Sequence, residues 1–219
     1  NDDWSYRAAL TFSGYAGGET LTNFPVLVNL AGFPGFAYGQ VADAAGGDLR
    51  FAGADGAELN FEIDFWNPSG DTFVWVQVPR LTNNVAITAY WGNAAATLPA
   101  YATDGSTWSN GYVAVYHLAE TSGTCGDSSP QANTLTLKGN TTLGSAGKVG
   151  LSPRLPDGNN DWLEAADHSS LEGMGRLTLE AWIYDEQNDT NPRAILSKRT
   201  SSNSQISFYL FKYTNRNIS

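Results

Sequence analysis

The sequence predicts an all-β protein that consists of two β-sandwich domains in tandem, the second of them incomplete. Val, Ile, Thr and aromatic residues recur in short runs between clusters of Gly, Asn, Asp and Pro, which is the composition of strands joined by turns. No window of about 11 to 18 residues carries the apolar stripe of an amphipathic helix. The strands after residue 111 are too few to close a two-sheet core, which predicts that the second sandwich lacks its closing strands.

The first predicted domain covers residues 1–95. Alternating or apolar runs predict strands at residues 4–12, 24–30, 72–78 and 85–91. A hairpin is expected from residues 48–51, an Asp-Gly turn at 55–56, and residues 59–65. Alternation in the second hairpin strand divides it into two faces. Leu59, Phe61, Ile63 and Phe65 form one face, and Asn60, Glu62, Asp64 and Trp66 form the other.

Residues 96–111 are small, polar and rich in turn residues, and we expect them to connect the domains. The second domain, residues 112–219, shows strand-like runs at 112–118 and 177–183 and a hairpin-like pair at 193–199 and 205–213. The sequence then ends at Ser219, which leaves strand edges to be paired. We therefore expect that the chain is a fragment, or that another chain or a further copy supplies the missing strands.

The charge balance excludes two classes of partner. A net charge of −10 opposes binding to nucleic acid and to an anionic membrane surface. No apolar run is long enough to span a membrane. The chain starts at Asn1 without Met, which is expected of a secreted or cell-surface protein whose leader was removed, and equally of a chain that was trimmed. Cys125 is the single cysteine, so it can form no disulfide within this chain.

The first domain resembles a bacterial envelope family of unknown function that often lies just upstream of laminin-G-like domains. The residues that carry this resemblance are Trp4, Tyr6, Arg7, 23–28 (N-F-P-V-L-V), 47–51 (G-D-L-R-F), Glu62, Ile63, Trp66, Asn67, Trp75, Val76 and 90–93 (Y-W-G-N). That family has no assigned chemistry to transfer.

The second domain is similar to the opening half of the laminin-G-like, concanavalin-like jelly roll. The matching residues are 115–118 (V-Y-H-L), Glu120, 127–129 (D-S-S), Gly147, Asp157, Gly158, 161–163 (D-W-L) and 179–182 (L-E-A-W). The resemblance implies a two-sheet module that binds or spaces, often with a structural calcium ion.

Two oxygen-rich loops are the candidate calcium site. Calcium prefers six to eight oxygen ligands from carboxylates, amides and carbonyls. The candidate ligands are Asp127, Asp157, Asn159 and Asp161. The alternative is that these residues form Asx turns and hydrogen-bond their own backbone.

Candidate catalytic and ligand-binding residues lie on the polar strand face. Glu62 and Asp64 match the first two acids of the E-x-D-x-x-E strand motif of concanavalin-fold glucanases, but the third position is Asn67. A solvated polar face is the alternative. Of seven tryptophans, we expect Trp66 and Trp108 to be exposed and to bind a ligand with Glu62 and Asp64, or to pack between the domains.

The remaining aromatic and histidine residues have structural expectations. Trp75 and Trp182 lie in apolar runs and are expected in the core. His117 is expected to be a hydrogen-bonded core or rim residue, and His168 to lie in a turn. No paired histidines of the kind that bind zinc occur in the sequence.

These features favour a non-catalytic, secreted or cell-surface module for adhesion that binds a polysaccharide or a matrix component and is stabilised by calcium. The first alternative is an assembly subunit of a filament, surface layer or split adhesin, completed by strands of another chain. The second alternative is a concanavalin-type glycoside hydrolase or lyase.

Overall fold

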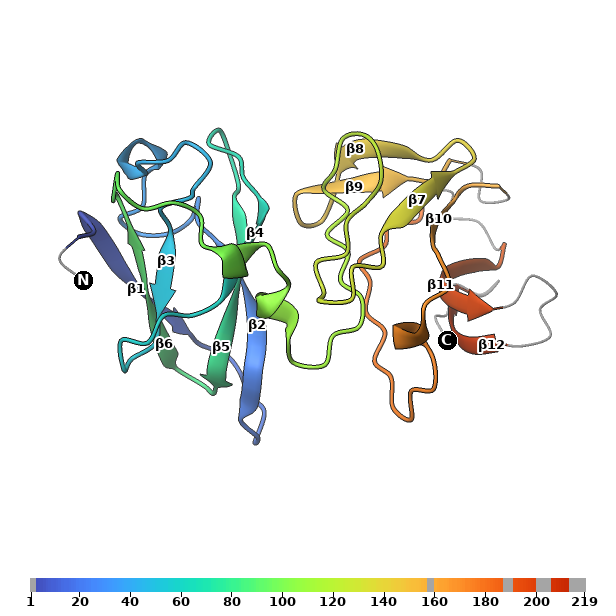
Figure 1. The fold of residues 1–219 in the computed structure, drawn as a ribbon, viewed down its shortest axis with the longest axis horizontal. Helices are drawn as coiled ribbons and strands as arrows, with labels where there is room; N and C mark the ends of the chain where they lie inside the picture. Colours follow the sequence, from blue (N-terminus) through green and yellow to red (C-terminus); the bar gives the residue numbers. More distant parts are fainter. Residues whose placement is uncertain (1–2, 157–159, 187–190, 200–205, 213–219) are drawn as a thin grey trace.

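The computed structural model describes residues 3–156, 160–186, 191–199 and 206–212. The predicted all-β class is confirmed: the described residues form twelve strands and four short 3₁₀ helices, with no α-helix among them. None of the helices in this part of the chain is long and apolar enough to cross a membrane. The strands form two groups that lie side by side, and the chain passes from one group to the other once (Figure 1).

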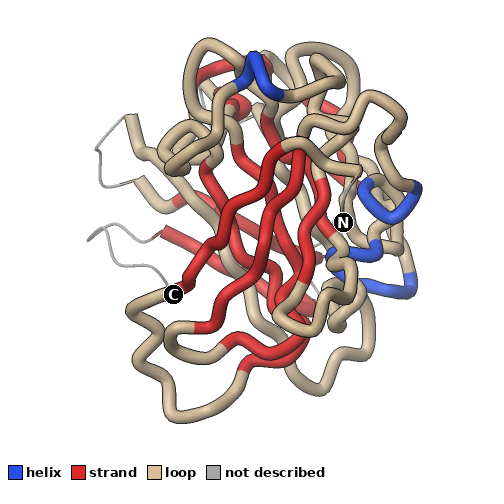
Figure 2. The backbone as a smooth tube through the Cα atoms, turned by 90° about the vertical axis from the view of Figure 1, so that its left-hand side faces the viewer, coloured by secondary structure: helices blue, strands red, loops and turns tan. Residues whose placement is uncertain are grey.

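The first unit contains two antiparallel sheets of three strands each. One sheet has the order β1 (Tyr6–Phe12), β6 (Val85–Trp91), β3 (Arg50–Ala52), and the other has the order β2 (Leu21–Asn29), β5 (Phe73–Leu81), β4 (Phe61–Phe65). The single-turn helix η1 (Tyr38–Gln40) lies in the long connection between β2 and β3. Seen from the side of this unit, its strands run next to one another (Figure 2). The strands predicted at 4–12, 24–30, 72–78 and 85–91 are confirmed with small shifts at their ends.

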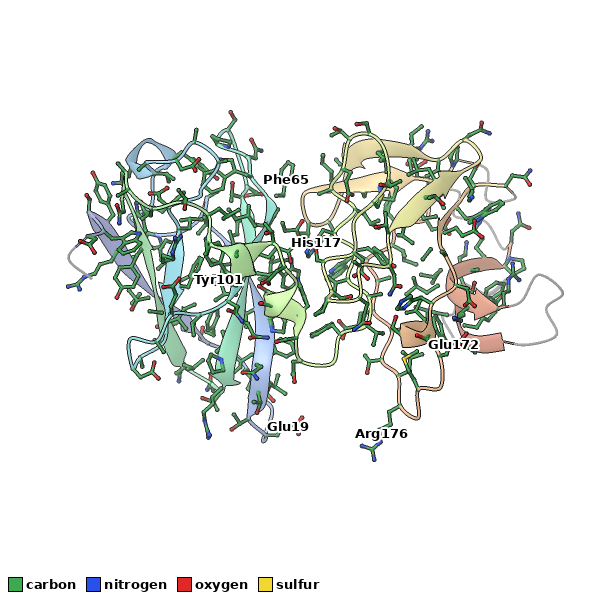
Figure 3. All side chains as sticks on the ribbon, viewed as in Figure 1. Glu19, Phe65, Tyr101, His117, Glu172 and Arg176 are labelled. Carbon is green, nitrogen blue, oxygen red and sulfur yellow. The ribbon has the colours of Figure 1, made fainter. Side chains whose placement is uncertain are left out.

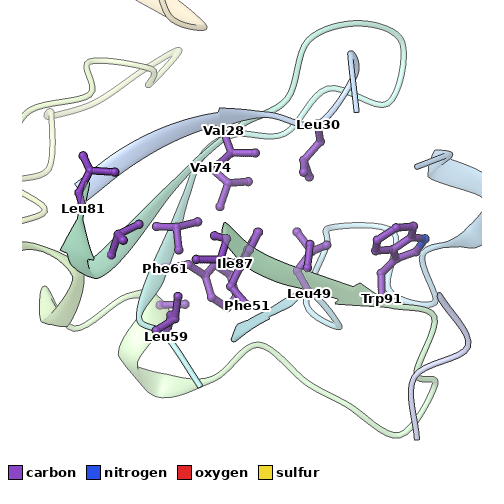
Figure 4. Close-up of a cluster of buried hydrophobic side chains, with 14 residues drawn as sticks. Val28, Leu30, Leu49, Phe51, Leu59, Phe61, Val74, Leu81, Ile87 and Trp91 are labelled. Atoms are coloured by element: carbon purple, nitrogen blue, oxygen red, sulfur yellow. The ribbon is translucent and has the colours of Figure 1, made fainter. Parts of the chain in front are cut away.

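The core of the first unit lies between these two sheets (Figure 4). Alternate residues of β5, namely Val74, Val76 and Val78, are buried there, as strand alternation requires. The rings of Phe51 and Phe61 meet edge to face at 5.3 Å across the two sheets. Burial of such side chains contributes about 1.5–3 kcal/mol each. This unit therefore has a closed apolar core of its own.

One buried acid ties the loops at the end of this sandwich together. Asp48 is fully buried just before β3, and its carboxylate accepts backbone N–H hydrogen bonds from four residues. The donors are Ala42, Asp43, Gly92 and Asn93. Burial by itself raises the pKa of Asp48, but these four bonds outweigh it and hold the pKa below its ordinary value. The loop before β3 is thereby fixed to the end of β6.

The predicted hairpin over residues 48–65 is correct at its turn and wrong in its pairing. Gly56 adopts φ +80°, and the turn closes through the bond from Gly53 N to the Ala57 carbonyl at 2.9 Å. Pairing extends only to a bridge between Ala52 and Glu58 and the adjacent bond from Leu59 N to Phe51 O. The chain then crosses to the other sheet, so β3 and β4 lie on opposite sides of the core. Local alternation cannot distinguish a hairpin from such a sheet-changing corner.

The connector contains two single-turn helices, η2 (Ala100–Ala102) and η3 (Ser106–Trp108). The second unit follows with three antiparallel strand pairs and the short helix η4 (Ser169–Leu171). The pairs are β7 (Leu135–Lys138) with β10 (Trp162–Ala165), β8 (Thr142–Ala146) with β9 (Leu151–Arg154), and β11 (Arg193–Arg199) with β12 (Ile206–Lys212). The last pair confirms the predicted hairpin over the residues that the structure describes.

Two predicted strands of the second unit are absent. Residues 112–118 form no regular strand, and Leu118 adopts φ +62°, which interrupts extended pairing. Residues 177–183 also pair with no strand among the described residues. Trp182, which was expected in the core, is 77% exposed, so that expectation is wrong. The strand-like segment that contains Trp182 joins none of the described sheets.

Apolar burial is sparse in the second unit. Among its described residues, Cys125 is the one apolar side chain that is fully buried. The large apolar residues that remain exposed are Leu155, Trp162, Leu177, Trp182, Ile183, Tyr184 and Tyr209. Among the described residues, the second unit therefore leaves more large apolar side chains exposed than the first unit, where Tyr6 and Phe24 are exposed.

Candidate functional site at the junction of the two units

The outer face of the β4–β5 sheet carries a polar group of residues that points toward the second unit. Phe61 is buried in the core and Ile63 packs against it, so alternation turns Glu62 and Asp64 to the opposite face. Glu62 pairs in register with Trp75 of β5. The predicted common face of Glu62 and Asp64 is therefore confirmed, but it is covered by protein: the two side chains are 18% and 2% exposed.

An irregularity at the end of β4 reverses the faces of the next two residues. The register with β5 shifts between Ile63 and Phe65, as in a β-bulge. Trp66 consequently turns to the core side, where its indole N–H donates to the Ala44 carbonyl at 2.7 Å. The expectation that Trp66 shares a face with Glu62 and Asp64 is wrong. Phe65, expected beside Ile63, instead faces Gly150 of the second unit, where an added methyl group would lie 2.9 Å from it.

The other predicted ligand-binding tryptophan is buried. Trp108, at the end of η3, is 4% exposed, so the expectation that it is solvent-accessible is wrong and its packing alternative holds. Its indole N–H donates to Glu62 Oε2, and its ring meets Trp75 edge to face at 5.2 Å. The Trp108 ring also meets Tyr112 at 5.2 Å and His117 at 5.6 Å. The connector thus covers the outer face of β4 and β5.

His117 contacts both acids of β4 from the first segment of the second unit. Its Nδ1 lies 3.1 Å from Asp64 Oδ2 and its Nε2 lies 3.5 Å from Glu62 Oε2. The ring stacks nearly parallel to Trp75, with 6.1 Å between centroids. The expectation of a hydrogen-bonded core or rim histidine is met in part: the largely buried ring pairs with Asp64 through Nδ1, whereas Nε2 makes only the longer contact with Glu62. Figure 3 shows His117 and Phe65 at the boundary between the two units.

The surroundings of His117 favour its charged form. Burial lowers the pKa of His117, but the close contacts with Asp64 and Glu62 and their negative charges outweigh burial and raise it to about 9. His117 is therefore an imidazolium at neutral pH. It forms a buried ion-pair group with two carboxylates of the first unit.

Further contacts occupy the same carboxylates. Ser128 Oγ donates to Glu62 Oε1 at 2.6 Å, and Trp75 Nε1 donates to Asp64 Oδ2 at 2.8 Å. We call Glu62, Asp64, Trp75, Trp108, His117 and Ser128 the junction cluster. Each acid of the cluster contacts the second unit or the connector, and both contact His117. The cluster resembles an electrostatic contact between domains more closely than a pair of acids on either side of an open cleft.

A cavity of about 360 Å³ opens beside the junction cluster. Its acidic lining comprises Glu62, Asp64, Glu120 and Asp127, and Thr103 lies at its edge. Asp64 Oδ1, Glu120 Oε2 and His117 Nε2 are buried and have no hydrogen-bond partner among the described residues. Glu120 Oε1 accepts from Gly126 N at 2.7 Å. The cavity is strongly acidic apart from His117.

A larger hollow of about 600 Å³ lies on the first unit, around Trp4, Arg50 and Asn93. Arg50 lies 5.9 Å from the centroid of the Trp4 ring and 3.3 Å from Glu58. Its guanidinium also donates to the carbonyls of Gly47, Leu49 and Thr97. Arg50 therefore joins these loops, and most of its guanidinium N–H groups already contact acceptors within the protein.

The predicted calcium ligands are only partly within the described structure. Asp157 and Asn159 lie outside the described residues. Asp127 accepts from the backbone N–H groups of Val115, Ser129 and Asn133 and from the Ser129 hydroxyl. Asp161 is buried and accepts from Asn140 N at 2.7 Å. In the part of the chain that the structure describes, no three His, Cys, Asp or Glu side chains form a group suited to a metal ion.

Part of the chain is similar to one known family. Residues 45–128 match the model of a family described as a domain of unknown function, DUF2341. No curated protein and no solved structure matches the chain significantly. The matched region runs from just before β3 to Ser128, so it includes every member of the junction cluster. The similarity therefore extends beyond the first sandwich, through the connector and into the segment docked on it.

Proposed function

We propose that the chain is a non-catalytic module of a secreted or cell-surface protein, in which the first unit is a platform and the second unit binds a polysaccharide or a matrix component. This proposal rests on one difference between the units: polar side chains of the first unit are engaged in contacts within the protein, whereas aromatic side chains of the second unit are exposed. The polar face of β4 is occupied by contacts with the connector and the second unit. The second unit, by contrast, leaves four aromatic side chains exposed among its described residues, namely Trp162, Trp182, Tyr184 and Tyr209.

The state of Glu62 supports a non-catalytic role. A retaining glycosidase needs a nucleophile and an acid about 5 Å apart with room for a sugar between them. Here Glu62 receives hydrogen bonds on both carboxylate oxygens, from Trp108 and from Ser128. The imidazolium of His117 lies against both candidate acids.

The exposed aromatic run at residues 182–184 supports binding. Trp182 and Tyr184 are 77% and 90% exposed, and the Lys148 ammonium lies 5.8 Å from the centroid of the Trp182 ring. Aromatic rings with polar groups beside them are suited to sugar faces and to protein surfaces. An apolar patch of this kind on a soluble domain typically marks an interaction site.

A glycan and matrix-protein array tests this proposal. The wild-type chain is compared with a Trp182→Ala/Tyr184→Ala double variant and with Phe24→Ala, which changes an exposed aromatic residue of the first unit. We expect binding by the wild type and by Phe24→Ala, and loss of binding by the double variant. Silence of the wild type on all surfaces, with and without calcium, would overturn the proposal.

A second candidate function, assembly by strand addition, is favoured by one observation. Residues 177–184 (L-T-L-E-A-W-I-Y) are rich in strand-forming residues, yet no strand among the described residues pairs with them. Such a segment can add to the sheet of another chain. Sedimentation velocity over a range of concentrations tests this function. Assembly that disappears in Ile183→Lys and persists in Phe24→Lys would support it, and a monomer at every concentration would exclude it.

A further inference from the structure

We propose that the junction cluster is a protonation-dependent latch: the charged imidazolium of His117 holds the second unit on the first, and loss of that proton releases it. The argument begins with the position of His117. It is the one histidine of the cluster, and it reaches both acids of β4 from the other unit at 3.1 and 3.5 Å. Its ring is only 14% exposed, so solvent screens these contacts weakly.

Among the described residues that line the cavity, His117 is the one basic side chain. β4 contributes Glu62 and Asp64, whereas β5 and η3 contribute the uncharged Trp75 and Trp108. The remaining ionisable groups around the cavity are Glu120, from the same segment as His117, and Asp127. All of these ionisable groups are acids. When His117 becomes neutral, the cluster retains buried carboxylates with no counter-charge, which is a strongly unfavourable arrangement.

The tyrosines and the cysteine nearby stay neutral over the range in which His117 loses its proton. Burial raises the pKa of Tyr112, and burial with the charge of Asp127 raises that of Tyr116 to about 12. Burial, followed by the influence of Glu120, raises the pKa of Cys125 to about 11. A transition near pH 9 at the junction therefore reports His117.

The direction of the pH effect follows from linkage. The pKa of His117 is raised from 6.5 to about 9 in the docked state. A raised pKa means that the stabilisation is complete below about 6.5 and is lost as the pH rises through about 9. The difference between the two pKa values corresponds to a roughly 300-fold greater preference of the charged form for the docked state.

The experiment measures the distance between the units in the full chain as the pH is raised. Spin labels are placed at Ala54→Cys in the first unit and Ala166→Cys in the second, since both positions are exposed and the native Cys125 is buried. We expect a narrow distance distribution near neutral pH that broadens with a midpoint of about 9. A distribution that stays narrow up to about pH 10 would overturn the proposal.

Matched variants separate the latch from general unfolding. His168 is the second histidine of the chain, is exposed, and lies 2.8 Å from Ser170 Oγ, so His168→Gln is the control. We expect His168→Gln to behave as the wild type, and His117→Gln to show a broad distribution at neutral pH with no transition near pH 9. Should His117→Gln fail to fold, Glu62→Gln serves as the second variant. Removal of one of the two negative charges must lower the midpoint by about one pH unit, and an unchanged midpoint contradicts the latch.

Discussion

Substitution of Trp108 tests whether the connector is fastened to the first unit through Glu62. Trp108→Phe keeps an aromatic ring against Trp75 but removes the indole N–H that donates to Glu62 Oε2. Glu62 then retains Ser128 and His117 but loses one charge-assisted hydrogen bond in a partly buried position. Loss of such a bond costs about 1.5–3 kcal/mol. The smaller ring adds a cavity cost of about 1 kcal/mol, so we expect a total near 3 kcal/mol.

Urea unfolding followed by circular dichroism measures this change. The control is Trp66→Phe, which removes a neutral hydrogen bond to the Ala44 carbonyl and is expected to cost about 1 kcal/mol from that bond. A double-mutant cycle of Trp108→Phe with Glu62→Ala should show a coupling energy above about 1 kcal/mol, because either substitution alone removes the bond that the two residues share. Additive effects, or a cost for Trp108→Phe below about 0.5 kcal/mol, would refute the reasoning.

Three further predictions follow from buried contacts and from the predicted calcium site. Asp48→Asn should lower the free energy of unfolding by about 3 kcal/mol, because the amide NH₂ group cannot accept hydrogen bonds from the backbone. Since the pKa of Asp48 is lowered in the folded protein, its stabilisation is present above about pH 3.8 and is lost as the pH falls through the lowered pKa. Acid unfolding should therefore include this loss in the wild type but not in Asp48→Asn. Gly150→Ala should cost more than Gly123→Ala in thermal unfolding, because both positions have positive φ but only Gly150 lies against Phe65; equal costs would contradict that contact. Millimolar calcium should change the melting temperature by less than about 1 °C, because Asp127 is already saturated with hydrogen bonds; a rise of several degrees that a chelator reverses would instead support the calcium site.

Sequence patterns predicted the strands of the first unit because their alternation is local. β6, for example, shows alternate burial at Ile87, Ala89 and Trp91, as the pattern indicates. The bulge after Asp64 could not be predicted in this way, since one inserted residue reverses every later face. That single irregularity accounts for the wrong placement of Trp66. The corner after Ala57 could not be predicted from the sequence either, because the turn residues around Gly56 do not specify which sheet the next strand joins.

The candidate site was predictable only in part, because its contacts join residues far apart in the sequence. Glu62 and Asp64 were identified from their alternation, but Trp108 lies 46 positions from Glu62 and Ser128 lies 66 positions from it. One signal did indicate the junction. A histidine within an apolar run, such as His117, needs polar partners when buried, and only acids would keep it charged. The apolar run at residues 112–118 was predicted as a strand, whereas it serves to carry this side chain to β4.

The protonation state of His117 tests the central claim most directly, because the docked junction requires an imidazolium between two acids. Nuclear magnetic resonance of the ¹⁵N-labelled histidine rings reports the protonation of each ring nitrogen as the pH changes. The account predicts that both nitrogens of His117 carry protons at neutral pH, and that the ring titrates near 9, with Glu62→Gln lowering this pKa. A neutral His117 ring at pH 7, titrating near the ordinary value of about 6.5, would contradict the account.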